Sequence, residues 1–343
     1  MSKSRRQPSV AAELYGLGAA PSAWSRGTRT TVDVLDTLVD AAVHLDRGEA
    51  EYLLIADSPE PRFGPDIDSA RPDALLVAAA LALHTDTVGL IPSVGLATTE
   101  PYHVSRAVAT LDIVSGGRGG WNPVLDSGAP RVDRARTERE PAAPEDRLER
   151  AGEHIDVTRA LAATWAPDAI LWDTASGRFL DATKVRPAPE TGPYYPVGDA
   201  SPTPQPPSGT LRTVLDATLD TAVFAAQRAD DIVVRASTLD EAGAVAAAVR
   251  AAAGGRDPVI RIAVTPYLTQ DDATRSATGR AHPSSANGIP VTGTVTEVVD
   301  EIARITSTLA TTALLLVLPD TRTAPRLWRS VVTGGLRAAT VDA

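Results

Sequence analysis

The segment PYHVSRAVATLDIVSGGRGGWN, residues 101–122, decides how the chain is expected to fold. Apolar side chains at positions 104, 107, 108, 111 and 114 share one face at helical spacing, which predicts a helix. The glycines from Gly116 onward end this helix, as glycines do at helix C-termini. The sequence RGGWN at 118–122 then predicts a short strand. The segment is therefore expected to form a helix, a turn and the next strand of a repeating unit.

The same alternation of strand and helix extends to both sides of this segment. Helical patterns are predicted at 73–85, 145–164, 219–229, 240–255, 296–309 and 324–336. Val-, Ile- and Leu-rich runs between them are typical of buried parallel strands. With RGGWN they are AELYGLG (12–18), YLLIAD (52–57), VGLIPSVG (88–95), LRTVLDA (211–217), DIVVRA (231–236), PVIRIAVTPYL (258–268) and ALLLVLP (313–319). Eight such units predict an α/β fold of the (β/α)8 type, the TIM barrel.

Two insertions interrupt the predicted repeat. The sequence LWDTASGRFLDATKV (171–185) predicts a β-hairpin, and a Pro-rich connection follows it to about residue 209. A connection as long as this Pro-rich one is either functional or disordered. The stretch 269–292 is polar, and it is expected to be a second, mobile insertion. Residues 1–11 are expected to be a disordered start, and residues 12–343 to form a single barrel domain.

Composition restricts the class of function. The 343 residues are 43% hydrophobic, enough for a large core, and the net charge of −10 with no basic run argues against nucleic acid. The absence of cysteine from the sequence excludes disulfides and thiolate chemistry. The five histidines lack HxxxH and HExxH spacing, so no metal site is expected. No secretory signal or membrane span is expected either, so the cytoplasm is the default location.

Polar residues at the ends of predicted strands are candidates for a site, because the chemistry of a (β/α)8 barrel takes place there. Asp57 ends YLLIAD, and Asn122 ends RGGWN. Asp216, Tyr267 and Asp320 occupy similar positions. Each of these residues could instead cap the following helix or bind loop backbone, so both interpretations stay open at this point.

The start of the predicted helix at 101 holds two further candidates. His103 and Arg106 lie three residues apart, so they share a face near a helix N-terminus that could help to hold an anion. A structural histidine and a salt-bridged arginine are the alternatives. The glycines at 116, 117, 119 and 120 do not form GxGxxG before a helix, so turn and strand-packing roles explain them better than a dinucleotide site.

Residues 101–122 resemble the signature of the bacterial luciferase-like monooxygenases. The resemblance is to the two-component, flavin-dependent branch that acts on nitrilotriacetate, EDTA, dibenzothiophene sulfone and long-chain alkanes. That branch reads PYHxAR and then a run like SLDxLSxGRxGWNxVTS. The resemblance extends over nearly the whole chain, through PSAWSR (21–26), LLIADS (53–58), residues 147–185, GRDP (255–258) and TGTVTEVVDEI (292–302).

This resemblance implies a (β/α)8 barrel that oxygenates a small organic substrate with O2 and reduced FMN. A partner flavin reductase would supply the FMN, and a homo-oligomer, dimer or tetramer, is implied. The protein would hold the cofactor, exclude water and orient the substrate. The family's roles carry over to six positions. Catalytic roles fall to His103 and Arg106, and cofactor binding falls to Asp57, Thr98, Asn122 and Arg147.

Four segments depart from the family pattern. Residues 95–97 replace a Ser-Thr-Thr strand end, and residues 123–126, 144–148 and 217–220 replace VVTS, HxxRY and AGxS. Of the usual phosphate partners only Arg147 remains, and Asp126, Glu145 and Asp220 place carboxylates nearby. Two alternatives therefore stay open. One is a degenerate barrel that no longer binds flavin and serves as a non-catalytic subunit or binding protein, and the other is an oxidoreductase that uses the deazaflavin F420.

Overall fold

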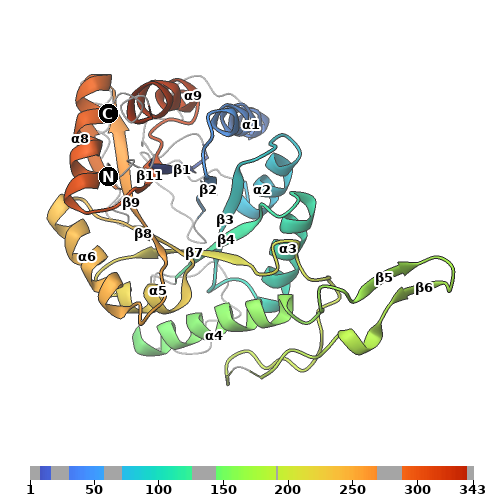
Figure 1. The fold of residues 1–343 in the computed structure, drawn as a ribbon. Coiled ribbons are helices and arrows are strands. Elements are labelled where there is room, and N and C mark those ends of the chain that lie inside the picture. Colours follow the sequence, from blue (N-terminus) through green and yellow to red (C-terminus); the bar gives the residue numbers. More distant parts are fainter. Residues whose placement is uncertain are drawn as a thin grey trace, which may run out of the picture.

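Parallel strands close into a barrel in the computed structural model, which describes residues 8–16, 31–57, 72–125, 144–190, 192–268 and 288–337. Around the ring, each strand pairs with the next, and β8 returns to pair with β9. The predicted (β/α)8 barrel is thereby confirmed (Figure 1). In ring order its strands are β9 (Val259–Tyr267), β11 (Ala313–Val317), β1 (Ser9–Leu14), β2 (Tyr52–Ile55), β3 (Gly89–Gly95), β4 (Gly120–Val124), β7 (Arg212–Ala217) and β8 (Asp231–Val234).

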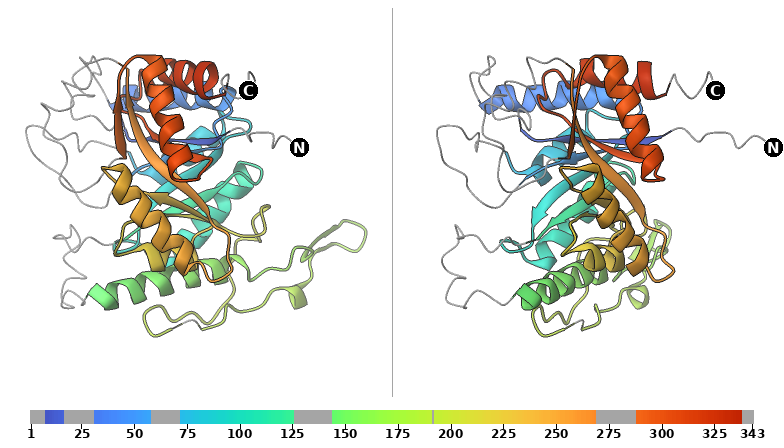
Figure 2. Two further views of the ribbon diagram at one scale, coloured as in Figure 1. Left: turned by 60° about the vertical axis from the view of Figure 1, so that its left-hand side comes forward. Right: turned by 90° about the vertical axis from the view of Figure 1, so that its left-hand side faces the viewer.

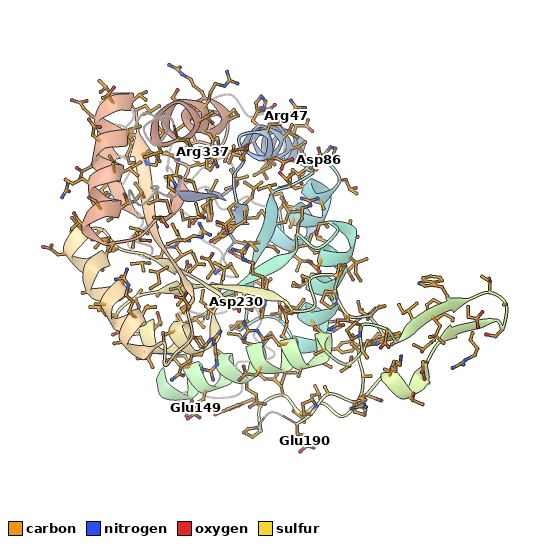
Figure 3. All side chains as sticks on the ribbon, in the orientation of Figure 1. Arg47, Asp86, Glu149, Glu190, Asp230 and Arg337 are labelled. Carbon is orange, nitrogen blue, oxygen red and sulfur yellow. The ribbon has the colours of Figure 1, made fainter. Side chains whose placement is uncertain are left out.

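Helices surround the barrel on its outer side (Figures 1 and 2). They are α1 (Thr31–Arg47), α2 (Ala74–Ala82), α3 (Pro101–Val114), α4 (Pro144–Ala162), α5 (Ala222–Arg228), α6 (Leu239–Ala252), α8 (Val295–Thr308) and α9 (Ala324–Trp328), which continues into a π-helical turn (Arg329–Leu336). The sequence had predicted all of these except α1. Its buried residues Val34, Leu38, Ala41 and Leu45 follow a spacing of three to four that could have identified it. Arg337, labelled in Figure 3, donates to the carbonyl oxygens of Gly48 and Glu49 just after α1.

The structure corrects the predicted boundaries in two places. The first strand begins at Ser9, not at residue 12, because residues 9–13 pair with β11; residues 9–11 are therefore not part of a disordered start. The insertion predicted at 269–292 ends in a strand, β10 (Ile289–Thr292), which pairs with residues 264–267 of β9. The remainder of that insertion, residues 269–287, lies outside the described residues.

The predicted hairpin is confirmed and projects away from the barrel (Figure 1). It consists of β5 (Ile170–Asp173) and β6 (Arg178–Leu180), and a short 3-10 helix (Ala182–Lys184) follows. The Pro-rich connection then returns along α4, where the buried carboxylate of Glu153 accepts the backbone N–H groups of Tyr194 and Tyr195 at 2.8 and 2.6 Å. Glu149 and Glu190 lie at the outer edge of this region (Figure 3). The connection is thus fastened to the barrel's outer layer by a side chain of α4.

The glycine-rich run after α3 is explained by turn geometry and close packing. Gly116 and Gly117 have positive φ values of 69° and 91°, in the turn that ends α3. A Cβ on Gly119 would lie 2.6 Å from the backbone nitrogen of Asp112, and Asp112 Oδ1 accepts the N–H of Gly119 at 2.9 Å. Arg118 lies between Gly117 and Gly119 in the sequence, and its guanidinium donates to the carbonyl oxygens of residues 82, 85, 88 and 115. The turn and strand-packing roles predicted for this run are confirmed.

A buried cluster of charged residues lies inside the barrel at the N-terminal ends of its strands. Arg261 of β9 is 0% exposed, and its Nε lies 3.0 and 2.9 Å from the two carboxylate oxygens of Asp231. Its Nη2 lies 2.6 Å from Oε2 of Glu51, and its Nη1 donates to Ser9 Oγ at 2.8 Å. Arg212 of β7 contacts Glu51 and Asp231 at 2.8 and 3.1 Å. This basal cluster connects β1, β7, β8 and β9 with the residue that precedes β2.

Replacing Gly119 by alanine should lower the free energy of unfolding by about 1–3 kcal/mol, because the new methyl group would meet the backbone of Asp112, which cannot rotate away. Gly243→Ala is the matched control. It lies in α6 with its nearest contact at 3.4 Å, so it should be neutral or stabilising by up to about 1 kcal/mol. Urea unfolding measures both, and equal effects of the two variants would contradict this account.

The basal cluster should also make stability depend on pH. Burial alone would raise the pKa of Glu51, but the charge of Arg261 and the hydrogen bonds from Ser9, Arg212 and Arg261 lower it from 4.5 to about 2. A carboxyl with a depressed pKa stabilises the fold fully above its unfolded value, and this stabilisation is lost as the pH falls through the folded value.

We therefore expect Glu51→Gln to be less stable than the native chain by about 1–2 kcal/mol above pH 5, after allowance for the solvent-exposed third of the side chain. The difference should shrink as the pH falls from 4.5 towards 2. Denaturant titrations of both proteins across this range measure it. A difference that stays constant with pH would show that the ionised carboxylate is not the stabilising species.

Candidate active site

The mouth of the barrel, where the C-terminal ends of the strands meet, holds the candidate site. Side chains alternate along each strand between the barrel interior and the helix layer. The interior cluster consists of Ala11, Tyr52, Leu54, Ile91, Val214, Val233, Ala263, Leu315 and Val317. Residues two positions further along β1, β3, β7 and β8 therefore face the interior at the mouth. They are Glu13, Ser93, Asp216 and Arg235.

Asn122, predicted to bind cofactor, lies inside the barrel and is 2% exposed. Its Oδ1 accepts a hydrogen bond from Ser93 Oγ of β3 at 2.9 Å. Its Nδ2 donates to the carbonyl oxygen of Val214 in β7, also at 2.9 Å. The amide thus connects β4 to the strands on both sides. In this structure its hydrogen bonds go to the protein itself.

Asp57 and Thr98, also predicted to bind cofactor, lie beside the strand ends on the neighbouring connections. Asp57 is partly buried, and its Oδ2 accepts the N–H of Ala74 at the start of α2 at 3.3 Å. Thr98 is exposed, and its hydroxyl donates to the carbonyl oxygen of Gly95 at 3.3 Å, within the turn that joins β3 to α3. Asp57 therefore accepts a hydrogen bond from the start of the following helix, as the alternative interpretation of its position expected. Its role towards a cofactor stays a prediction.

His103 and Arg106, predicted to be catalytic, lie on the exposed side of α3. Both contact the same residue, Tyr102. The His103 ring packs edge-on against the Tyr102 ring with centroids 5.5 Å apart, and the Arg106 guanidinium lies over that ring at 5.5 Å. The structure thus brings the two residues together around one aromatic ring, while Asn122 lies inside the barrel. Their catalytic role stays a prediction.

Arg147, the last predicted cofactor ligand, is partly buried in the first turns of α4. Within the described part of the chain, its guanidinium has no hydrogen-bond or ion-pair partner. About two turns further along the helix, His154 is fully buried, and its Nε2 lies 3.2 Å from the carbonyl oxygen of Thr99. The rings of Trp121 and Tyr195 pack around His154 with centroids at 6.3 and 5.2 Å. α4 therefore contacts both β4 and the turn that holds Thr98.

Three charged residues at the mouth went unrecognised as a group in the sequence. Arg235 Nη2 lies 2.5 Å from Oε2 of Glu13, and its Nε donates to Oδ1 of Asp216 at 3.0 Å. Only Asp216 had been singled out. The signal was available, because Glu13 interrupts the apolar run VAAEL and Arg235 follows DIVV, each at an inward-facing position. We refer to Glu13, Asp216 and Arg235 as the mouth triad.

The described residues offer neither a metal site nor a membrane-spanning helix. Within them, no group of three or more His, Asp or Glu side chains could hold a metal ion. None of the helices in the described ranges combines the length and apolar character needed to cross a bilayer.

Asn122→Asp should test how the mouth is held together. The carboxylate could not donate to Val214, and it would bury a charge without a cationic partner in contact, so we expect a loss of about 3 kcal/mol at pH 7. Ser93→Ala, which removes one hydrogen bond to the same amide, should cost about 1 kcal/mol. Guanidinium unfolding compares the two, and a larger loss for Ser93→Ala would refute the assignment.

Comparison with known proteins identifies related sequences. A luciferase-like monooxygenase family model matches residues 17–289. N-acetyl-S-(2-succino)cysteine monooxygenase of Bacillus subtilis (strain 168) is 28% identical over 278 residues, which cover 78% of this chain and 62% of that protein. Dibenzothiophene-sulfone monooxygenase of Rhodococcus erythropolis is 30% identical over 249 residues, which cover 67% of this chain and 54% of the relative. The chain thus spans less than two thirds of the length of these relatives.

Solved structures share the fold. EDTA monooxygenase from Chelativorans sp. BNC1 superposes with a TM-score of 0.80 at 21% identity, over 97% of this chain and 94% of that one. A riboflavin lyase gives a TM-score of 0.81 at 21% identity, over 98% and 93%. These likenesses concern the barrel, whereas the family model matches the sequence over well more than half of the chain. The chain therefore belongs to the luciferase-like monooxygenase family.

Proposed function

We propose that this chain is a flavin-dependent monooxygenase that uses reduced FMN and O2 on a small organic substrate. The match of the family model to residues 17–289 carries the proposal. It is supported by relatives named as monooxygenases of dibenzothiophene sulfone and dimethyl sulfide. A type II Baeyer-Villiger monooxygenase, solved in complex with FMN, shares the fold with a TM-score of 0.67. Another relative is named component A of nitrilotriacetate monooxygenase, and a protein that acts as one component favours a partner reductase for this chain.

Two of the predicted cofactor ligands, Arg147 and Thr98, lie on or beside α4 and suit the phosphate group of FMN. Arg147 is a partly buried cation that pairs with no described residue, so its charge is available for a phosphate group. The exposed hydroxyl of Thr98, in the turn that packs on α4 through His154, offers a second donor. Asp57 at the end of β2 would accept a hydrogen bond from the cofactor. We assign cofactor binding to these three residues, and to Asn122 a contact at the barrel wall.

When bound, reduced FMN supplies the electrons that activate O2. The protein's own contribution is to hold the cofactor and to keep water out. The apolar interior below the mouth, with Tyr52, Leu54 and Ile91 in it, provides a dry floor. His103 and Arg106 would act from the start of α3 as a proton donor and a cationic group toward the substrate. A homo-oligomer and a cytoplasmic location are part of the same proposal.

A second candidate is a barrel of this family that no longer binds flavin. Two observations favour it. Both polar atoms of the Asn122 amide already hydrogen-bond to the protein, at Ser93 and Val214. The two carboxylates of the mouth triad outnumber its one guanidinium where a flavin would approach. An F420-dependent oxidoreductase is a third candidate, since an F420-dependent secondary alcohol dehydrogenase shares the fold with a TM-score of 0.65.

Anaerobic titration with FMN, FMNH2, riboflavin and F420 separates these candidates. We expect saturable binding of FMNH2 in the micromolar range, about 8 kcal/mol of binding free energy. Arg147→Ala should weaken FMN and FMNH2 binding by about 1.5–3 kcal/mol, the value of a charge-assisted hydrogen bond. It should leave riboflavin, which lacks the phosphate, unchanged.

Arg178→Ala is the matched control, because Arg178 is an exposed arginine on the projecting hairpin (Figure 1). It should not affect either ligand. Absence of saturable FMNH2 binding up to about 1 mM, which would leave only about 4 kcal/mol, refutes the monooxygenase and favours the flavin-free candidate. Tight binding of F420 in place of FMNH2 would favour the third.

A further inference from the structure

The mouth triad is a second, largely buried ion cluster in the barrel, at the end opposite the basal cluster. The basal cluster at the opposite end already connects β1, β7, β8 and β9. The triad joins three of the same strands, through Glu13, Asp216 and the residue after β8. Buried ion pairs contribute little net stability, because desolvation of the charges offsets their attraction. A second cluster at the end of the barrel where ligands bind therefore requires a functional explanation.

Burial within the mouth triad is uneven. The side chain of Glu13 is 7% exposed and that of Arg235 is 12% exposed, whereas that of Asp216 is 43% exposed. Asp216 Oδ1 accepts a hydrogen bond from Arg235 Nε, and within the described residues Oδ2 has no partner. The cluster thus presents a carboxylate to whatever enters the mouth. The arginine lies behind it and holds it in place.

The net charge of the triad also points to the ligand. Two carboxylates and one guanidinium give −1, or zero if Glu13 binds a proton. Burial raises the pKa of Glu13; the charge of Arg235 opposes this, and the carboxylate of Asp216 adds to the rise. Burial would lower the pKa of Arg235, but both carboxylates raise it, so the guanidinium stays charged. The triad therefore has no net positive charge at neutral pH, and in its −1 state it repels anions and attracts cations.

We propose that the mouth triad selects a substrate that carries a protonated amine, with Asp216 as its direct partner. Arg235 and Glu13 act as positioning residues, since they fix the Asp216 carboxylate without facing the solvent themselves. An ammonium group would bring the net charge of the site to zero and would donate to Asp216 Oδ2. The net charge of −10 over the whole chain favours the approach of cations as well. The proposal rests on the proposed function only in treating the bound amine as the substrate.

Three amines, one neutral alcohol and one carboxylate test this preference in the native protein. Methylammonium, benzylammonium and spermidine are titrated by calorimetry against benzyl alcohol and benzoate. We expect at least one ammonium probe to bind at least about tenfold more tightly than benzyl alcohol. We expect benzoate not to saturate. The ammonium affinity should fall as NaCl rises from about 20 to 500 mM, while that of benzyl alcohol should not.

Asp216→Asn keeps the shape of the side chain and removes its charge. It should abolish the preference for the ammonium probe, a loss of about tenfold or more. Asp257→Asn is the matched control, because Asp257 is an exposed aspartate just before β9, at the opposite end of the barrel. It should keep the full preference. Circular dichroism establishes that both variants are folded.

Three results would overturn the proposal. They are equal binding of ammonium and alcohol probes by the native protein, a preference for benzoate, and an unchanged preference in folded Asp216→Asn. If Asp216→Asn does not fold, the native ranking and its salt dependence still decide. FMNH2 titrations of the same proteins keep the two proposals apart. Flavin binding without amine preference refutes the amine site alone, and amine preference without flavin binding refutes the monooxygenase alone.

Discussion

The buried contact of Arg261 with Asp231 and Glu51 is the interaction on which the barrel depends. A guanidinium with no solvent exposure is stable only if its charge and its N–H groups are matched, and here the partners come from separate strands. The register of β8, β9 and the start of β2 must therefore be correct for any of these charges to be tolerated. A shift of one residue would turn Arg261 toward the helix layer. The cluster thus specifies register as much as it contributes stability.

The fold could be predicted from sequence because its signals are local. Alternation of apolar runs with helical patterns identified the eight barrel strands. The glycines of RGGWN were interpreted as packing positions, and the structure gives the reason: the backbone of Asp112 leaves no room for a side chain at Gly119. Ser9 was assigned to a disordered start because it directly follows the polar, basic segment MSKSRRQP. β10 was missed for a different reason. Its four residues become a strand only because β9 extends past its pairing with β8.

The candidate site could be predicted less fully, because it depends on contacts between distant residues. Strand-end position predicted Asp57 and Asn122 as site residues, and that role stays a prediction. It could not tell that the Asn122 amide hydrogen-bonds to Ser93 and Val214. The mouth triad joins residues 13, 216 and 235, and only the closure of the barrel brings them together. His103 and Arg106 were grouped correctly by helical spacing. What they share, an aromatic ring from the same helix, follows from the turn geometry of α3.

The placement of β10 has a consequence for how this barrel can vary. The connection that leaves β9 after Tyr267 returns at Gly288, whose backbone lies against Ala263 of the same strand, so it starts and ends within one strand's length. The entropy of closing such an excursion grows only with the logarithm of its length, by about 0.6 kcal/mol for each doubling. Lengthening or shortening this connection therefore leaves the anchoring pairs intact. Related barrels should therefore tolerate insertions and deletions between Tyr267 and Gly288, provided that the close approach of Gly288 to Ala263 is kept.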